Sequence, residues 1–352
     1  MKRILGIFRG FPGLGRVVAG VSLLESLRDD YNCKIQIVTY LQGNEYLKSR
    51  GYSCTYEALP MDYCSIGLLP TNQMGVHIHS IIKVFDPNVV IIDGEPLILH
   101  SLRISYPKLK IVALLNPSDV DNPENDKEAM DYFNALYSLS NLAIIHGLRT
   151  VVPLYNYERY ISIDTVIRKE ILSINNIRSK NIYCVLGGGT VNVGQQFAES
   201  SIRIGELCQE VAFSLKDYKM HIICSSHNIY VALKEKGTYE NVILHKNVLD
   251  ARTYYSDACL IITRSGRNTL SELAYLGIPT ISFVSGCNYR RNEQEQNIRS
   301  IDSQNIATAT LDCTDKDFLS LCFKMLATGK SINSFHYGNK IALNNILKLL
   351  HE

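Results

Sequence analysis

The sequence of 352 residues predicts an α/β protein made of two Rossmann-like, doubly wound parallel-sheet domains in tandem. Short runs rich in valine, isoleucine and leucine alternate with amphipathic segments, as in parallel sheets buried on both faces. The alternation pauses once, over the more polar stretch 156–181, and then restarts. A chain of this length also exceeds one typical core. We therefore expect two domains that face a central cleft.

The first domain is expected at 1–155. Its predicted strands are 4–8, 34–40, 88–94, 110–116 and 141–147. Its predicted helices are 17–27, 73–85, 96–105 and 123–138. Each strand is almost continuously apolar, which indicates burial on both faces. The stretch 156–181 lacks a clean strand and is interpreted as the linker.

The second domain is expected at 182–330. Its predicted strands are 182–190, 220–226, 242–246, 259–265, 279–285 and 306–312. Two helices, 315–327 and about 332–350, follow. We expect the final segment, 331–352, to pack back on the first domain.

Composition excludes some classes of protein. The net charge of +2 gives no electrostatic argument for a nucleic-acid partner. The ten cysteines are scattered and none has C-x-x-C spacing, so neither a zinc ribbon nor a redox motif is indicated. No secretion signal or stretch of membrane-spanning length is evident. These features predict a cytoplasmic protein.

Two glycine-rich loops each follow the first strand of a domain. Gly13 and Gly15 lie in one, and 187–190 form the other. Converging backbone N–H groups and a helix N-terminus favour an anion there. Neither loop has G-x-G-x-x-G spacing and no P-loop occurs, which argues against a nicotinamide enzyme or a P-loop NTPase. Either loop alone fits a tight turn, but two equivalent loops favour phosphate binding.

A third motif is "TRSGRNTLSELAYLGIPTISF", from Thr263 to Phe283. It predicts a strand, a turn, a helix and a second strand. Gly266 permits a close backbone approach, and Gly277 ends the helix. Thr269 and Glu272 have capping-box spacing, which predicts a helix start at Thr269. The turn is either an ordinary connection in a βαβ unit or a ligand site at the carboxyl end of a parallel strand.

The stretch "RSGRNTLSELAYLGIPTISFV", with "EQEQNI" at 293–298, resembles the donor-site signature of GT-B glycosyltransferases. It is most similar to the family that adds N-acetylglucosamine to the lipid-linked peptidoglycan precursor. "GLGRVVAGVSLLESL" and "YCVLGGGT" resemble that family's two glycine loops, and "FDPNVVIIDGEP" resembles an N-domain strand. The resemblance covers most of 182–312 and is patchy before it. It implies the GT-B fold, with an acceptor-side first domain and a nucleotide-sugar-binding second domain.

The resemblance also implies a donor site without metal or cofactor. Its residues are Gly188, Gly189, Thr190, Val248, Arg264, Ser265, Gly266, Thr269, Glu272, Glu293 and Gln294. The carboxylate of Glu272 is implied to accept from the ribose hydroxyls, and backbone donors to stabilise the diphosphate. Alternatives stay open: Glu272 as a helix cap, Arg264 as a support of the turn, and Glu293 and Gln294 as a solvated helix face.

One departure concerns catalysis. The family's first loop carries a histidine, whereas this chain has Arg16, which cannot act as a base. Asp93 and Glu95 are the candidate bases, and N-capping of the helix after Pro96 is their alternative role. Arg16 is a candidate for binding an anionic acceptor or the diphosphate. The departure leaves open a changed or lost activity.

A rival pattern is Asp119-x-Asp121, the spacing of metal-binding aspartates in GT-A glycosyltransferases. An acidic surface loop is the favoured interpretation, because a GT-A enzyme has no role for the second α/β domain. The predicted function is a metal-independent, inverting transfer from a nucleotide sugar, with uridine diphosphate preferred. The acceptor is a glycan, a lipid-linked molecule or a small molecule, and peripheral membrane association is left open. A nucleotide-sugar hydrolase and a non-catalytic nucleotide-sugar-binding protein are the alternatives.

Overall fold

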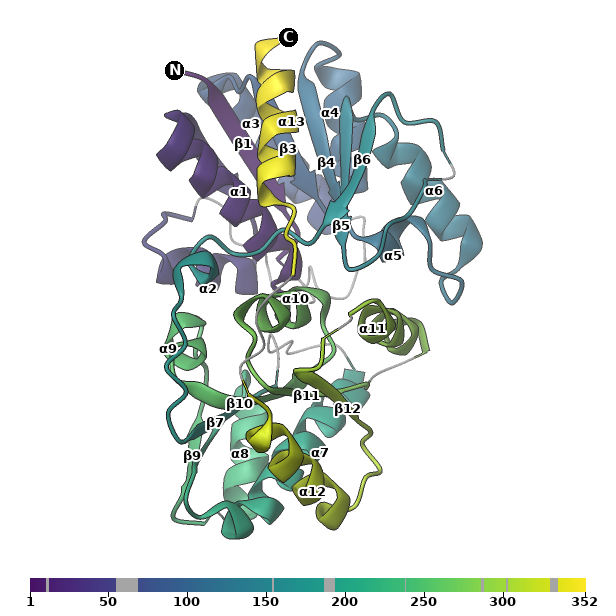
Figure 1. The fold of residues 1–352 in the computed structure, drawn as a ribbon. Helices are drawn as coiled ribbons and strands as arrows, with labels where there is room; N and C mark the ends of the chain where they lie inside the picture. Colours follow the sequence, from purple (N-terminus) through teal and green to yellow (C-terminus); the bar gives the residue numbers. More distant parts are fainter. Residues whose placement is uncertain are drawn as a thin grey trace. The chain divides into compact units, whose positions relative to one another are not determined.

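The structure is a computed structural model that describes residues 1–10, 13–54, 69–153, 155–186, 194–237, 239–285, 288–301, 303–329 and 335–352. The chain divides into two compact units. Met1–Lys169 and Tyr337–Glu352 form the N-terminal unit, and Glu170–His336 form the C-terminal unit. Each unit contains one six-stranded parallel sheet with flanking helices, which confirms the predicted α/β fold class (Figure 1).

The N-terminal sheet has the strand order β2-β1-β3-β4-β5-β6. Its strands are β1 (Arg3–Phe8), β2 (Lys34–Val38), β3 (Val89–Asp93), β4 (Lys110–Leu115), β5 (Leu142–Gly147) and β6 (Tyr160–Asp164). The chain moves from β1 outward to β2 and then returns to the other side of β1 as β3. The strand order therefore reverses between β1 and β3, and ligands bind beyond the carboxyl ends of the strands at such a point.

Helices cover both faces of this sheet, because alternate residues of its strands contribute to different cores. Ile4 and Phe8 of β1 belong to one core, and Leu5 and Ile7 belong to the other. The helices with side chains in the first core are α1 (Gly15–Tyr31), α2 (Gln42–Ser49) and α13 (Asn339–His351). Those in the second are α3 (Leu69–Phe85), α4 (Pro96–Ser105), the short α5 (Pro117–Val120) and α6 (Lys127–Tyr137).

The strand β6 lies inside 156–181, which was predicted to be a linker without a strand. That prediction is wrong. β6 pairs with β5 alone and forms the outer edge of the sheet. Its residues are exposed or half-buried throughout, in contrast to the fully buried β3 and β5. An edge strand needs no continuous apolar run, and for this reason the hydrophobic pattern did not reveal it.

The last helix, α13, belongs to the N-terminal unit although it follows the whole C-terminal unit in sequence. Ala342 and Ile346 are fully buried in the core that α1 shares, and Figure 1 shows the yellow helix beside the N-terminal sheet. At its start, the Asn339 side chain accepts from the Ile167 amide at 2.8 Å and donates to the Ile167 carbonyl at 2.8 Å. These paired bonds fix where the chain re-enters the unit.

The C-terminal sheet has the order β12-β11-β10-β7-β8-β9, with a reversal between β7 and β10. Its strands are β7 (Asn181–Val185), β8 (Lys219–Ile223), β9 (Val242–His245), β10 (Ala258–Arg264), β11 (Thr280–Phe283) and β12 (Ile306–Ala309). Its helices are α7 (Gly194–Ala212), α8 (His227–Glu235), α9 (Arg252–Tyr255), α10 (Arg267–Leu276), α11 (Asn288–Ser300) and α12 (Asp315–Ala327). Two short 3₁₀ helices, η2 and η3, occupy Ile171–Ser173 and Phe213–Leu215. Side chains of α7, α8 and α12 share one core with the strands.

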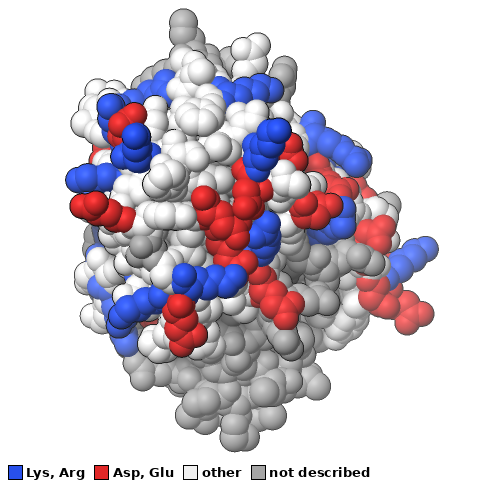
Figure 2. All heavy atoms as spheres, turned by 90° about the horizontal axis from the view of Figure 1, so that it is seen from below, with Lys and Arg blue, Asp and Glu red and all other residues white. Residues whose placement is uncertain are grey.

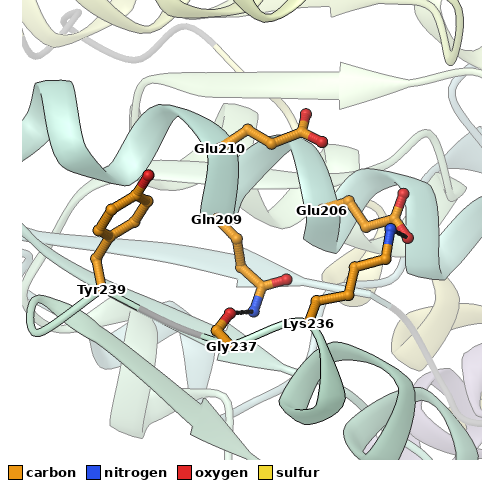
Figure 3. A pocket seen from close by; sticks show the side chains of 6 residues that line it. All are labelled: Glu206, Gln209, Glu210, Lys236, Gly237 and Tyr239. Atoms are coloured by element: carbon orange, nitrogen blue, oxygen red, sulfur yellow. Dashed lines mark hydrogen bonds and ion pairs between the residues drawn. The ribbon is translucent and has the colours of Figure 1, made fainter.

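The surface has two further features. On the face in Figure 2, basic and acidic side chains are interspersed and form no continuous basic surface. A pocket of about 460 Å³ between α7 and the end of α8 is lined by Glu206, Gln209, Glu210, Lys236, Gly237 and Tyr239 (Figure 3). None of the predicted donor-site residues that the structure describes lines it. Among the described helices, none has the length and apolar character needed to cross a membrane.

Candidate functional site

In the N-terminal unit, Arg16 joins two carboxylates at the carboxyl ends of the strands. It is the second residue of α1, directly after the first glycine loop, and Gly13 and Gly15 flank that turn. Its Nη1 donates to Asp93 Oδ1 at 2.5 Å. The guanidinium also binds Asp119 with both terminal nitrogens, at 2.7 and 3.0 Å. Asp93 ends β3 and is 1 % exposed, so Arg16 neutralises a carboxylate that is almost fully buried.

Glu95 lies two residues beyond Asp93 and has different partners. Tyr40 Oη donates to Glu95 Oε1 at 2.7 Å, and Arg9 Nε lies 3.5 Å from the same oxygen. Tyr40 follows β2 and Arg9 follows β1, so the cluster gathers at the point where the strand order reverses. The two candidate bases therefore sit in adjacent but separate networks.

Gly94 explains how neighbouring carboxylates reach separate networks. Its φ of +84° is favourable only for glycine. A Cβ at this position would lie 2.7 Å from Arg16 Cδ and 2.7 Å from Arg9 Cβ. The missing side chain thus lets both arginines pack against the turn between Asp93 and Glu95.

We expect Gly94→Ala to lower the free energy of unfolding by about 1–3 kcal/mol, because it adds an overlap to an unfavourable φ. Gly51→Ala is the matched control, since Gly51 has a φ of +81° and no atom within 4 Å of a built Cβ. Urea denaturation of both variants measures the difference. Equal losses for the two would show that the arginines do not need the space at Gly94.

Charge fixes the protonation of this cluster. Burial lowers the pKa of Arg16, but Asp119 and Asp93 outweigh that effect and hold the pKa well above its ordinary value. The pKa of Arg9 is also raised, because Glu95 and Tyr40 outweigh its burial. Burial and the charge of Glu95 raise the pKa of Tyr40 well above its ordinary value. Arg16 and Arg9 are therefore cations, and Tyr40 is a hydrogen-bond donor, throughout the neutral range.

The structure corrects one alternative role proposed for the carboxylates. Glu95 is the N-cap residue of α4 by position, but its side chain makes no capping hydrogen bond. Asp93 ends the strand β3, and Gly94 and Glu95 separate it from the helix. The rival aspartates also have separate roles: Asp119 binds Arg16, whereas Asp121 Oδ2 accepts from Arg149 at 2.6 Å. Their carboxylates are thus engaged by different arginines.

In the C-terminal unit, Ser265 fixes the turn between β10 and α10. Its hydroxyl lies 2.6 Å from Ser282 Oγ and donates to the Phe283 carbonyl at 3.0 Å. Asn297 Nδ2 of α11 donates to the Ser265 carbonyl at 3.3 Å. Gly266 follows as the exposed N-cap of α10, with nothing within 4 Å of a built Cβ. Ser265 therefore supports the turn, and a side chain at Gly266 would meet open space among the described residues.

Arg264 also has a supporting role. It ends β10, is 7 % exposed, and donates from Nη1 to Ser201 Oγ of α7 at 3.1 Å. Thr263 Oγ1 donates to the Val185 carbonyl at 3.0 Å. These bonds tie β10 to β7 and to the helix that follows the second glycine loop. The alternative in which Arg264 holds the turn agrees with this geometry.

Glu272 lies within α10, and not in a capping box. The helix begins at Arg267 with Gly266 as its N-cap, so the predicted start at Thr269 is wrong. Spacing alone could not reveal that a glycine without a side-chain cap starts the helix one turn earlier. Glu272 is 2 % exposed, and its Oε2 accepts from Tyr255 Oη at 3.4 Å. Thr269 is half-buried in the first turn of the helix.

The other predicted donor-site residues are distributed among loops and α11. Val248 is half-buried in the loop between β9 and α9. Gln294 Oε1 accepts from the Ser285 amide at 2.7 Å, which ties α11 to the end of β11. Glu293 is half-buried on the same helix. Gly188, Gly189 and Thr190 lie outside the described residues.

Several residues of both clusters were not predicted from the sequence. They are Arg9, Tyr40 and Gly94 in the N-terminal unit, and Ser201, Tyr255, Ser282 and Asn297 in the C-terminal unit. The one available sequence signal was the glycine between two acidic residues in "DGE", at the end of an apolar run; the structure gives this glycine, Gly94, a positive φ. The others are brought close only by strand order.

Comparisons with known proteins agree with this architecture. Residues 191–318 match the glycosyltransferase family 28 C-terminal domain. A stretch of 75 residues is 36 % identical to the UDP-N-acetylglucosamine–N-acetylmuramyl-(pentapeptide) pyrophosphoryl-undecaprenol N-acetylglucosamine transferase of Bacillus pumilus. That match spans 21 % of this chain and 20 % of the relative, about one fifth of its length.

Solved structures are similar over the whole chain. The MurG protein of Acinetobacter baumannii has a TM-score of 0.57 at 14 % identity, covering 99 % of this chain and 100 % of its own. The UDP-GlcNAc 2-epimerase of Neisseria meningitidis, bound to UDP-GlcNAc, has a TM-score of 0.63 at 14 % identity, covering 98 % and 100 %. At this identity the likeness shows the fold. Together with the matched domain it confirms the resemblance to GT-B glycosyltransferases: the whole chain has their fold, and residues 191–318, in its C-terminal unit, match the glycosyltransferase family 28 C-terminal domain.

Proposed function

We propose that this protein transfers a sugar from a nucleotide-diphosphate sugar to an acceptor hydroxyl, without a metal and with inversion at the anomeric carbon. The observation that carries the proposal is the turn between β10 and α10, inside the family 28 domain. There Ser265, Ser282 and Asn297 hold an exposed glycine backbone at the carboxyl end of a central strand. Such a rigid turn suits the close approach of a nucleotide.

The chemistry of the site fits such a donor. A buried carboxylate, Glu272, suits the two adjacent hydroxyls of a ribose, because hydrogen bonds to a charged acceptor are strong. The second glycine loop would supply backbone donors to the diphosphate, which is the leaving group. The transferase of Bacillus pumilus and the epimerase of Neisseria meningitidis both have a uridine nucleotide sugar in their names, and this supports uridine diphosphate as the preferred carrier.

The acceptor class and the compartment are further parts of the proposal. The name of the Bacillus pumilus relative gives a pyrophosphoryl-undecaprenol acceptor, so we propose a lipid-linked acceptor as the first class to test. Such an acceptor would bring the protein to a membrane surface from the cytoplasm. The eight cysteines among the described residues are all free thiols, which agrees with a reducing compartment.

A ligand screen tests the donor. Uridine diphosphate at one hundred times its dissociation constant is expected to add about 2.7 kcal/mol of stability, which thermal unfolding readily detects. Adenosine and guanosine diphosphates are the matched comparisons. A protein stabilised by none of the three would contradict the proposal.

We expect turnover to survive a chelator. Proton NMR of UDP-N-acetylglucosamine incubated with the protein and a lipid-linked acceptor should show the same glycoside with and without EDTA. Its anomeric coupling gives the stereochemistry. An absolute requirement for manganese would contradict the metal-independent mechanism. Free sugar alone would indicate the hydrolase, and an epimerised nucleotide sugar would indicate an epimerase.

A further inference from the structure

Three carboxylates gather at the carboxyl ends of the N-terminal strands, and they differ in how their oxygens are engaged. Asp93 is 1 % exposed and gives Oδ1 to Arg16. Asp119 gives both oxygens to Arg16, and its Oδ2 also accepts from the Asn116 amide at 2.8 Å. A carboxylate that is buried or doubly engaged in this way is poorly placed to accept a proton from a substrate.

Glu95 is different, because only one of its oxygens is engaged. Tyr40 Oη and Arg9 Nε both approach Oε1. Within the described part of the chain, no group donates to Oε2. The Glu95 side chain is nevertheless only 7 % exposed, so its orientation is restricted. It presents one free oxygen from a fixed position.

The partners of Glu95 orient it in the way that a neighbouring residue orients a catalytic base. In acid–base pairs, the base is oriented by a neighbour on its far side and leaves one atom for the substrate. Here Tyr40 and Arg9 occupy Oε1, and Gly94 directs Glu95 away from the Arg16 cluster. Arg16, which replaces the histidine expected from the resemblance, therefore has a structural role: it fixes Asp93 and Asp119.

We infer that Glu95 is the general base of the proposed transfer, that Tyr40 is its positioning residue, and that Asp93 and Asp119 are not bases. Glu95 Oε2 takes the proton of the acceptor hydroxyl. The acceptor oxygen forms its bond to the anomeric carbon while the bond from that carbon to the diphosphate oxygen breaks. The diphosphate leaves with the electron pair. This assignment rests on the proposed function.

The pH dependence follows from the groups around Glu95. The described titratable and charged groups that face it are Tyr40 and Arg9, with Arg16, Asp93 and Asp119 beyond Gly94. Tyr40 stays protonated and Arg9 stays charged, because the pKa of each is raised. The proposal therefore predicts that kcat falls on the acid side, because only a charged carboxylate can accept the proton of the acceptor hydroxyl.

The test measures release of uridine diphosphate from UDP-N-acetylglucosamine, with water or a lipid-linked acceptor, as a function of pH. We expect Glu95→Gln to lower kcat by about 100- to 10,000-fold with little change in KM, and to lack the acid-side fall. Tyr40→Phe should lower kcat less and keep the acid-side fall, because it disturbs only the orientation of the base.

Glu25→Gln is a closely matched control. Glu25 is 5 % exposed and also accepts from a tyrosine and an arginine, Tyr52 at 3.0 Å and Arg50 at 2.5 Å. It lies ten residues into α1 from Gly15, about 15 Å along the helix from the carboxyl edge. Its variant should keep the wild-type kcat and pH profile. Thermal unfolding of both variants checks that each is folded.

The outcomes separate the two proposals. Suppose that wild type turns over and that Glu95→Gln either has an unchanged kcat or keeps the fall of kcat on the acid side. Either result would overturn the assignment of Glu95 and leave the proposed transfer intact. Loss of the acid-side fall in Asp93→Asn instead would assign the base to Asp93. Wild-type protein that binds uridine diphosphate but releases none from any donor would overturn the proposed transfer and the assignment with it.

Discussion

Replacement of Arg16 by methionine is expected to lower the free energy of unfolding by about 3–5 kcal/mol, because it leaves buried carboxylates without their cation. Asp93 is 1 % exposed, and the Asp119 side chain is 14 % exposed, so water does little to screen them. Methionine keeps much of the side-chain volume and removes the charge. Urea denaturation at neutral pH measures the loss.

Arg159→Met is the matched control for this experiment. Arg159 also donates from two nitrogens to a carboxylate, that of Glu352, at 2.6 and 2.8 Å. Both side chains, however, are more than one third exposed. Exposed pairs contribute at most about 1 kcal/mol. Restoring stability to Arg16→Met by adding Asp93→Asn and Asp119→Asn would confirm the cause. A loss as small as that of the control would contradict the structural role of Arg16.

The second large effect is expected at Glu272. Glu272→Gln should weaken binding of uridine diphosphate by about 10- to 150-fold, since hydrogen bonds to a charged group contribute about 1.5–3 kcal/mol. The amide keeps one acceptor oxygen but loses the charge. Calorimetric titration measures the dissociation constant. Glu210→Gln, an exposed glutamate of α7 in the same unit, is the control and should bind as wild type does.

The corrected start of α10 changes the expected effect on stability. Because Gly266 is the N-cap, removing the Glu272 side chain deletes no cap. It does remove an acceptor for the Tyr255 hydroxyl. Tyr255 is only 1 % exposed. Some loss of stability is therefore expected from Glu272→Ala whether or not a ribose binds there.

The parallel strands were predictable from the sequence because burial on both faces demands continuous apolar runs. The strands β3, β4 and β10 show this, with 88–94, 110–116 and 259–265 predicted. The edge strand β6 was missed, because pairing along one side tolerates polar residues. The start of α10 was missed because glycine caps a helix without a side-chain signature.

Site residues were predictable only where they follow a strand directly. Asp93 and Glu95 were found because "DGE" ends an apolar run, and Ser265 and Gly266 were found in the same way. Their partners were not. Arg16 and Asp119 are 103 positions apart, and Tyr40 and Glu95 are 55 apart, so only the strand order brings them together.

One pair of titrations tests directly whether Glu272 holds the ribose of a nucleotide donor. Wild type and Glu272→Gln are each titrated with uridine diphosphate and with its 2′,3′-dideoxy analogue, which lacks both ribose hydroxyls. If Glu272 holds the ribose, wild type should bind uridine diphosphate at least about tenfold more tightly than the variant. With the dideoxy analogue, the two dissociation constants should be equal. An equal advantage for both ligands, or none for either, would show that Glu272 supports the fold and does not bind the ribose.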